Sequence, residues 1–197
     1  MSLGGAHSEA EEGVNELTAN ILSFIRTSQS TKPWKIIFCS GTGTTAFFAA
    51  RYLALHSTDR DVDVEAIAIP VAGSKSYLME QMTQLDEEAD CIFPRLLSTC
   101  NTPLNRQFAE PYIEHLQLWH RLKEDTNIDF DLIYAPRAFE LMLEDSKDSG
   151  NVNTQTSSGY MDLSTWMSHA NIIYYHCGGL EGNPTQLSRY RYKKLIE

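Results

Sequence analysis

The chain has 197 residues, a hydrophobic fraction of 42% and a formal net charge of −10. This length and apolar content predict one folded domain and exclude a generally disordered chain. The acidic balance argues against a nucleic-acid partner, because a negative surface repels phosphate backbones.

The cysteines and the apolar runs narrow the class of protein further. The four cysteines form no CxxC pair and show no zinc spacing. No apolar run approaches the roughly 18 residues typical of a membrane helix, and there is no signal peptide. We therefore expect a cytoplasmic protein with no metal site and no membrane partner.

The first half of the chain alternates helix and strand patterns. Ser8 and Glu11 have the spacing of a capping box, and apolar residues then recur at helical period until Lys32-Pro33 breaks the helix. The pattern predicts a helix over 8–27, a buried strand over 35–39, a helix over 46–56, a strand over 62–69 and a helix over 74–85.

The second half continues the alternation after a polar loop over 101–107. Its pattern predicts an amphipathic helix over 110–125, a strand over 130–134, a helix over 138–143, a polar loop over 145–158, a strand over 171–176 and a helix from about 184. Strands and helices that alternate with short connections predict an α/β fold, a three-layer parallel sheet flanked by helices.

The strongest chemical signal is the segment CSGTGTT, at 39–45, between a strand and a helix. Glycines let the backbone approach a ligand closely, and the following helix offers free N–H groups and the positive end of its dipole. This arrangement suits a phosphate group. It is not a Walker loop, because no lysine follows the glycines at the required spacing. A plain strand-to-helix turn is the alternative.

The segment CSGTGTT also resembles the phosphate-holding loop, roughly CSVTGST, of the 1-aminocyclopropane-1-carboxylate deaminase and D-cysteine desulfhydrase family. Three other segments agree in the family's order. GGAHSEAEEG, at 4–13, resembles GGSNxxGxxGY; FDLIYAPRAFELM, at 130–142, resembles LDPVYTGKAMxGM; and HCGG, at 176–179, resembles HTGG. The resemblance covers nearly the whole chain.

The resemblance implies a tryptophan-synthase-β-like large domain that binds pyridoxal 5′-phosphate and a small amino-acid substrate, from which ammonia and a 2-oxo acid are released. It implies Tyr134 as a catalytic residue, with an acid, base or nucleophile role that needs a lowered pKa or a proton relay. The residues implied to bind the cofactor are those of the loop and of the HCGG segment: Ser40, Gly41, Thr42, Gly43, Thr44, Thr45, Cys177, Gly178 and Gly179.

Three positions depart from the deaminase pattern. Ala135 stands where the deaminases place a glutamate that faces the pyridine nitrogen, and Pro136-Arg137 replace the family's glycine and lysine. Cys177 stands where the desulfhydrases place a threonine hydroxyl. Its thiol is expected either to contact the ring nitrogen or to be a small buried filler.

No lysine of this chain matches the family's Schiff-base segment, SNKxRK. We therefore expect residues 4–197 to be the C-terminal part of the large domain, without the small domain, after a three-residue leader. Such a fragment is predicted to be inactive alone and to self-associate through exposed apolar surface. Two other interpretations stay open, a non-catalytic phosphate- or nucleotide-binding α/β module and a family member that has lost catalysis.

Overall fold

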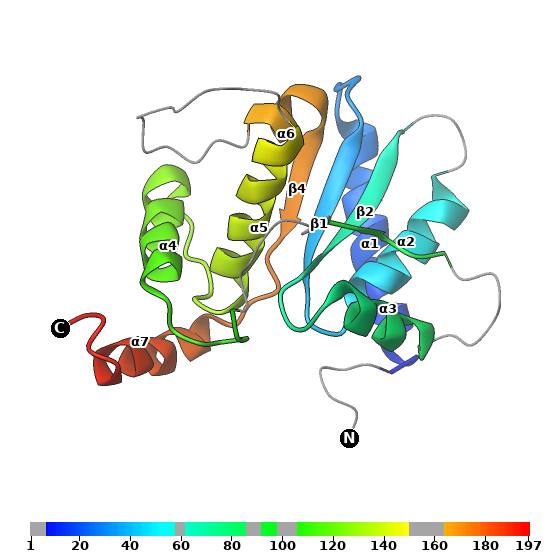
Figure 1. The fold of residues 1–197 in the computed structure, drawn as a ribbon. Coiled ribbons are helices and arrows are strands. Elements are labelled where there is room, and N and C mark those ends of the chain that lie inside the picture. The colour runs from blue at the N-terminus through cyan, green and yellow to red at the C-terminus, as the bar shows by residue number, and fades with distance from the viewer. Residues whose placement is uncertain (1–6, 58–61, 86–91, 98–105, 150–163) are drawn as a thin grey trace.

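The computed structural model describes residues 7–57, 62–85, 92–97, 106–149 and 164–197. Within these ranges an all-parallel, four-stranded sheet has the strand order β3-β2-β1-β4. Helices cover both faces of this sheet (Figure 1), so the expected α/β fold with a parallel sheet is confirmed. The strands are β1 (Trp34–Ser40), β2 (Val64–Pro70), β3 (Arg95–Leu96) and β4 (Asn171–Tyr175).

The helices alternate with these strands along the chain. α1 precedes β1, α2 connects β1 to β2, and α3 connects β2 to β3. The helices are α1 (Ala10–Thr27), α2 (Thr44–His56), α3 (Lys75–Thr83), α4 (Ile113–Thr126), α5 (Tyr134–Ser149), α6 (Ser164–His169) and α7 (Asn183–Tyr192), with a short 3₁₀ helix, η2 (Leu180–Gly182), before α7.

Strand β1 is the central element of the sheet. It pairs with β2 along its whole length, from Trp34 opposite Val64 to Ser40 opposite Pro70, and with β4 on its other side. Ile36 and Ile37 are both fully buried although successive side chains of a strand point to opposite faces. A parallel strand that is covered on both faces needs a continuous apolar run, which is the pattern that identified this strand in the sequence.

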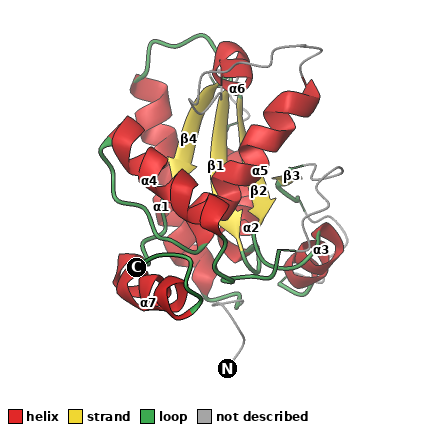
Figure 2. Ribbon diagram, turned by 60° about the vertical axis from the view of Figure 1, so that its left-hand side comes forward, coloured by secondary structure: helices red, strands yellow, loops and turns green. Residues whose placement is uncertain are grey.

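Two hydrophobic cores lie on the two faces of the sheet. Helices α1, α2 and α3 pack on the face to which Ile36 and Phe38 point, and α4 and α5 pack on the face of Ile37. Figure 2 shows the strands between these helices, with α3 and α7 at the end of the molecule to which the strand arrows point. This end contains the carboxyl ends of the strands.

Helix α1 forms where the apolar period predicts it, but its N-terminus differs from the prediction. The helix begins at Ala10, its N-cap residue is Glu9, and no side chain caps it. The predicted capping box is wrong, because Ser8 contributes only its carbonyl oxygen, which accepts from the Glu11 N–H. The buried residues of α1 are Val14, Thr18, Leu22 and Ile25, while Phe24 is 60% exposed.

The predicted strand over 130–134 is wrong. Residues 130–133 are irregular, and Tyr134 is the first residue of α5. Side chains take the backbone groups that a strand would pair. Asn183 donates to the Phe130 carbonyl (2.9 Å) and accepts from the Leu132 N–H (2.8 Å), and the Trp119 indole also donates to the Phe130 carbonyl (2.7 Å).

The second half of the chain contains further differences of extent. Helix α5 replaces the predicted helix over 138–143 and continues through 149, so the first part of the predicted loop over 145–158 is helical. The sequence pattern missed β3 and α6, which are only two and six residues long. The predicted leader, residues 1–3, and most of the predicted loop over 101–107 lie outside the described residues.

Among the described residues, none of the helices has both the length and the apolar content to cross a membrane.

The turn into α2 requires a glycine, and this can be tested by substitution. Gly43 has φ +80°, and a Cβ there would lie 2.8 Å from Met82 and 2.9 Å from Leu78. Gly43→Ala is therefore expected to destabilise the protein by at least about 2 kcal/mol, from backbone strain and the clash. Urea unfolding followed by circular dichroism measures this.

The matched control is Gly13→Ala. Gly13 lies inside α1, and a Cβ there would meet nothing within 4 Å. Alanine in a helix interior is expected to stabilise by about 0.5–1 kcal/mol relative to glycine. Equal unfolding midpoints for the two variants would contradict this account of the turn.

Candidate functional site

The strand order creates a topological switch point between β1 and β4. The chain leaves β1 through α2 on one face of the sheet toward β2, and it reaches β4, on the other side of β1, after α4 and α5 on the opposite face. In open parallel sheets the connections diverge at such a point and leave a crevice outside the carboxyl ends of the strands, where ligands bind. The candidate site therefore lies where β1 and β4 end.

The loop after β1 leads directly into the N-terminus of α2. Gly43 is the N-cap residue, no side chain caps the helix, and no acidic residue lies in its first turn. The first N–H groups of α2 therefore have no carboxylate partner from the cap or the first turn, and they carry the positive end of the helix dipole. Thr44 and Thr45, which the pattern placed before the helix, form its first turn.

The hydroxyl groups of this loop have different environments. Ser40 is buried and its hydroxyl donates to the Phe38 carbonyl (3.1 Å), so this hydroxyl is directed into the strand. Thr42 is half-buried, and its Oγ1 lies 3.0 Å from Oγ1 of Thr44. The hydroxyls of Thr42 and Thr44 therefore lie together at the start of α2, next to the amides of its first turn.

Tyr134 lies beside this loop, as the resemblance implies, but on a helix and not on a strand. A Cβ at Gly41 would lie 3.9 Å from Cε1 of Tyr134. Burial, followed by the neighbouring Cys39 and Asp131, raises the pKa of Tyr134 above its usual value. A general base or nucleophile role would need a lowered pKa, so the phenol is better suited to donate a hydrogen bond.

Asp131 positions Tyr134 at the candidate site, and the sequence analysis missed it. Its buried carboxylate accepts from the N–H groups of Ile133 (3.0 Å), Tyr134 and Ala135 (3.2 Å), and so caps the N-terminus of α5. Because these three donors are satisfied by a side chain, the chain turns into a helix at Tyr134. An Asp followed by Pro136, in the first turn of the helix where no N–H is needed, was the available signal.

The segment after β4 brings the second set of predicted residues to the same edge. Cys177 is exposed, and its Sγ lies 3.4 Å from Sγ of Cys39, the penultimate residue of β1. The interpretation of Cys177 as a buried filler is therefore wrong. Gly178 and Gly179 have φ of +87° and +89°, and a Cβ at Gly179 would lie 3.5 Å from Cβ of Asp131.

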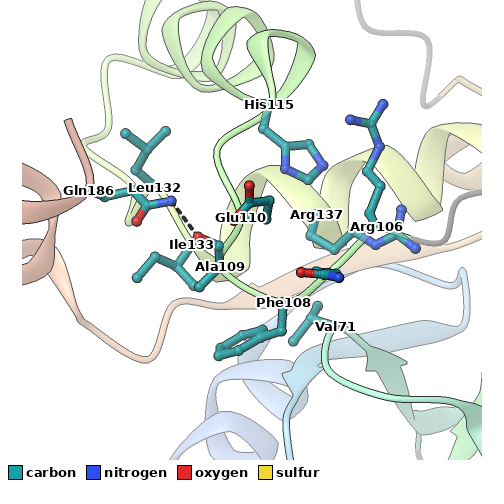
Figure 3. A pocket seen from close by; sticks show the side chains of 11 residues that line it. Val71, Arg106, Phe108, Ala109, Glu110, His115, Leu132, Ile133, Arg137 and Gln186 are labelled. Atoms are coloured by element: carbon teal, nitrogen blue, oxygen red, sulfur yellow. Dashed lines mark hydrogen bonds between the residues drawn. The ribbon is translucent and has the colours of Figure 1, made fainter. Parts of the chain in front are cut away.

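Figure 3 shows a small pocket next to this edge. Its lining includes Val71, which follows β2, and Ile133, which precedes Tyr134. Phe108 belongs to the lining and also contacts the ring of Tyr134, with 5.3 Å between ring centroids. The loop after β1 does not line this pocket, and Tyr134 lies beside both, next to Phe108 of the pocket lining and next to Gly41 of the loop.

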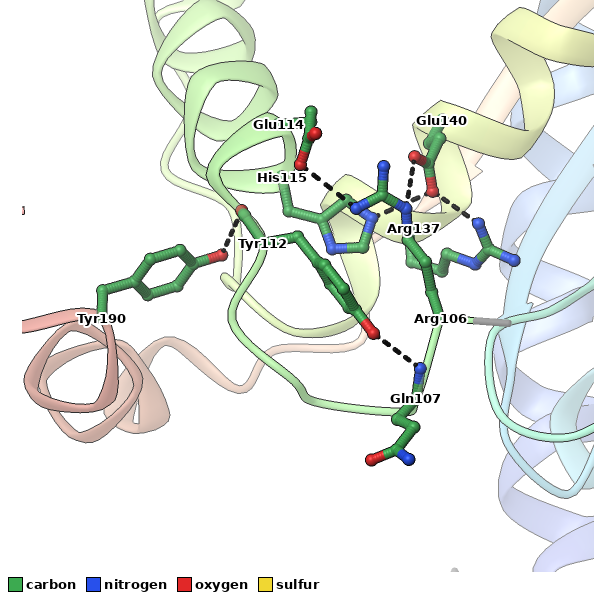
Figure 4. A network of polar contacts seen from close by, with 8 residues as sticks. All are labelled: Arg106, Gln107, Tyr112, Glu114, His115, Arg137, Glu140 and Tyr190. Atoms are coloured by element: carbon green, nitrogen blue, oxygen red, sulfur yellow. Dashed lines mark hydrogen bonds and ion pairs between the residues drawn. The ribbon is translucent and has the colours of Figure 1, made fainter. Parts of the chain in front are cut away.

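One wall of the pocket is an ion-pair network around Glu140 on α5 (Figure 4). Arg106 Nε lies 3.1 Å from one carboxylate oxygen of Glu140, while His115 (2.9 Å) and Arg137 contact the other. Arg106 also reaches Glu114 (3.2 Å), and its guanidinium lies over the ring of Tyr112. The network joins the segment before α4, α4 itself and α5.

Comparison with protein families and with curated proteins finds no match for this chain. The family resemblance thus depends on the four motifs, of which the structure describes the segments 7–13, 39–45, 130–142 and 176–179. Three of these, all but the first, converge at the carboxyl edge of the sheet.

Removing the Asp131 carboxylate is expected to destabilise α5 and to displace Tyr134. Asp131→Ala leaves three backbone N–H groups without their acceptor, and we expect a loss of about 2 kcal/mol in the free energy of unfolding. Asp131→Asn retains a capping oxygen and is expected to lose less. The measurement is urea unfolding of both variants.

Asp129→Ala provides the control, since Asp129 is an exposed partner of Lys123. Loss of an exposed ion pair is expected to change stability by less than about 0.5 kcal/mol. A D131A protein that is no less stable than D129A would show that Asp131 does not hold the start of α5.

The stability conferred by Glu140 is expected to depend on pH. Burial alone would raise the pKa of Glu140, but the hydrogen bonds and charges of His115 and Arg137 hold it below its usual value of 4.5. A lowered carboxyl pKa stabilises the folded state above pH 4.5, and this stabilisation is lost as the pH falls through the folded-state pKa.

Glu140→Gln is therefore expected to cost about 3 kcal/mol at pH 7, as for a buried ion pair that loses one partner. The difference from the unsubstituted protein should shrink as the pH is lowered below 4.5. Thermal unfolding from pH 3 to pH 7 measures it, and a difference that stays constant over this range would refute the role of the Glu140 charge.

Proposed function

We propose that the carboxyl edge of the sheet binds the phosphate group of pyridoxal 5′-phosphate, and that the chain is the cofactor-holding part of a lyase or deaminase that acts on a small amino acid. The proposal includes a large domain of the tryptophan-synthase-β-like type, to which a four-stranded parallel sheet between helices corresponds in its general architecture. Ammonia and a 2-oxo acid are the products expected of such an enzyme.

The observation that carries the proposal is the uncapped N-terminus of α2. A helix of 13 residues begins there after a glycine-rich turn, without a side-chain cap and without an acidic residue in its first turn. A helix N-terminus normally acquires such a partner, because it stabilises the helix. Helix α7 also lacks a side-chain cap and an acidic first turn, and what distinguishes α2 is its glycine-rich turn beside the topological switch point, a position that suits an anion.

The residues at this edge fit the cofactor in their donor chemistry. The amides of Thr44 and Thr45 and the hydroxyls of Thr42 and Thr44 would hold the phosphate, and Tyr134 presents a protonated phenol beside them. When bound, the cofactor supplies an electron sink for negative charge that forms on the substrate. The chain's own contribution is to anchor the phosphate and to orient Tyr134 through the Asp131 cap.

The site favours a desulfhydrase-like arrangement over a deaminase-like one. Ala135, in the first turn of α5, is fully buried in the core between this helix and the sheet, so its side chain does not face the site. The deaminases place there the glutamate that faces the pyridine nitrogen. Cys177, at the position of the desulfhydrase hydroxyl, is exposed at the same edge and is the weak donor available for this contact.

A second candidate function is a non-catalytic module that binds a phosphate or a nucleotide. The observation that favours it is in the sequence, where no lysine stands in a context like the family's Schiff-base segment. Such a module would use the same α2 N-terminus, and the two functions differ in the rest of the ligand that they accept and in catalysis.

A charge introduced at Thr45 tests the binding site. Thr45 is half-exposed in the first turn of α2, where an acidic residue favours the helix but repels a phosphate. We expect Thr45→Glu to weaken the binding of pyridoxamine 5′-phosphate by about tenfold or more, corresponding to at least about 1.4 kcal/mol. Thr45→Gln serves as the matched control, because glutamine has the same shape as glutamate but carries no charge.

Isothermal titration calorimetry with pyridoxamine 5′-phosphate, pyridoxamine, inorganic phosphate and ADP measures the affinities. The amine form of the cofactor is used because its aldehyde would also react with surface lysines. Binding that requires the phosphate and is lost in T45E supports the proposal. Equal affinity of pyridoxamine with and without phosphate would exclude the phosphate site, and a preference for ADP would favour the second candidate function.

A further inference from the structure

We propose that Cys39 and Cys177 form a reversible intramolecular disulfide by exchange with low-molecular-weight disulfides, with Cys177 as the attacking thiol and Cys39 as the resolving thiol. This inference rests on the geometry of the two thiols and does not depend on the proposed function. It concerns residues 138 positions apart in the sequence that the sheet brings together.

The distance between the two sulfurs suits a disulfide. Sγ of Cys39 and Sγ of Cys177 are 3.4 Å apart, and a disulfide bond of about 2.05 Å leaves about 1.4 Å to close. Cys39 is in β1 and pairs with Ile69 of β2. Cys177 lies beyond Tyr175, the last residue of β4 that pairs with β1, and Gly178 and Gly179 follow it. Closing the gap is therefore expected to move Cys177, which lies in irregular backbone after β4, more than Cys39.

The two thiols differ in exposure, which assigns their roles. Cys177 is exposed and can be reached by a small disulfide, whereas Cys39 is half-buried against the core beneath α5. The hydrogen bond from Cys39, first among its causes, lowers the pKa of Cys177 to about 7. The same contact and burial raise the pKa of Cys39. The reactive thiolate at neutral pH is therefore that of Cys177.

The exchange balances in two steps. The Cys177 thiolate attacks one sulfur of oxidised glutathione, the S–S bond of the reagent breaks, and one glutathione thiolate leaves. Cys39 then attacks Sγ of Cys177 and its proton passes to the second glutathione thiolate as it leaves. The protein loses two electrons and two protons in total, and oxidised glutathione is reduced to two molecules of the thiol.

The cross-link would join β1 to β4 at the edge where the candidate site lies. Cys39 directly precedes Ser40 and the loop that leads into α2, and Cys177 directly precedes Gly178. Oxidation would also remove the exposed thiol from this edge.

The test uses a Cys91→Ser/Cys100→Ser background, so that Cys39 and Cys177 are the remaining cysteines. The folded protein is treated with oxidised glutathione at pH 7, quenched with N-ethylmaleimide under denaturing conditions, and examined by intact mass and tandem mass spectrometry. We expect a monomer that lacks two hydrogens, takes up no maleimide, gives a peptide joining Cys39 to Cys177, and returns to the dithiol with dithiothreitol.

Two further substitutions in this background separate the roles of the thiols. Cys39→Ser is expected to accumulate one glutathione adduct on Cys177, because no thiol resolves it. The Cys177→Ser protein is expected to react at least about tenfold more slowly than the background protein, because the remaining thiol is half-buried and protonated. Circular dichroism checks that each variant is folded. Peptide mapping of the oxidised, unsubstituted protein is expected to find the same linkage between Cys39 and Cys177.

Stable glutathione adducts on both cysteines without a cross-link, a cross-link only between molecules, or no reaction of the folded protein would overturn the inference. Faster reaction of C177S than of C39S would overturn the assignment of the attacking thiol.

Discussion

Burial of β1 on both faces is the constraint on which the rest of the structure depends. Ile36 and Ile37 are fully buried in successive positions, which is possible only when helices cover both sides of the sheet. The order β3-β2-β1-β4 then places the switch point of the sheet between β1 and β4. The carboxyl end of β1 therefore becomes the point at which the loop before α2, Tyr134 and the segment after β4 can meet.

A second determinant is a set of hydrogen bonds between side chains and the backbone of residues 130–135. Asp131 and Asn183 take N–H and carbonyl groups that an extended strand would have offered to the sheet. Each of these bonds is local or comes from the start of α7, so the segment turns into α5 and does not extend the sheet. Tyr134 is thereby fixed at a helix start that faces the glycine-rich loop. The ion pairs of Glu140 hold the next turn of α5 to α4 and to the segment before it.

The N-termini of α2 and α5, which both lie at this edge, have opposite electrostatic environments. The N-terminus of α5 is neutralised internally by the Asp131 carboxylate, whereas that of α2 has neither a cap nor an acidic first turn. The positive end of the α2 dipole therefore has no acidic partner from its own cap or first turn, and Tyr134 lies beside the loop that precedes it. A bound phosphate would be stabilised by the uncapped N-terminus of α2. The disulfide proposed between Cys39 and Cys177 would add a redox-active group at the same edge.

Elements with a local signal can be predicted from the amino-acid sequence. The apolar run of β1, the glycine turn into α2, the helical period of α1 and the alternation of strands and helices were all predictable, because each depends on residues that are close in the chain. The sequence did not predict that Phe130–Tyr134 avoids the sheet, because Asn183, some 50 residues away, competes for its backbone. Likewise, the contact between Cys39 and Cys177 and the raised pKa of Tyr134 arise only from the folded arrangement of the chain. Distances and burial between remote segments set these properties, and no spacing in the chain encodes them.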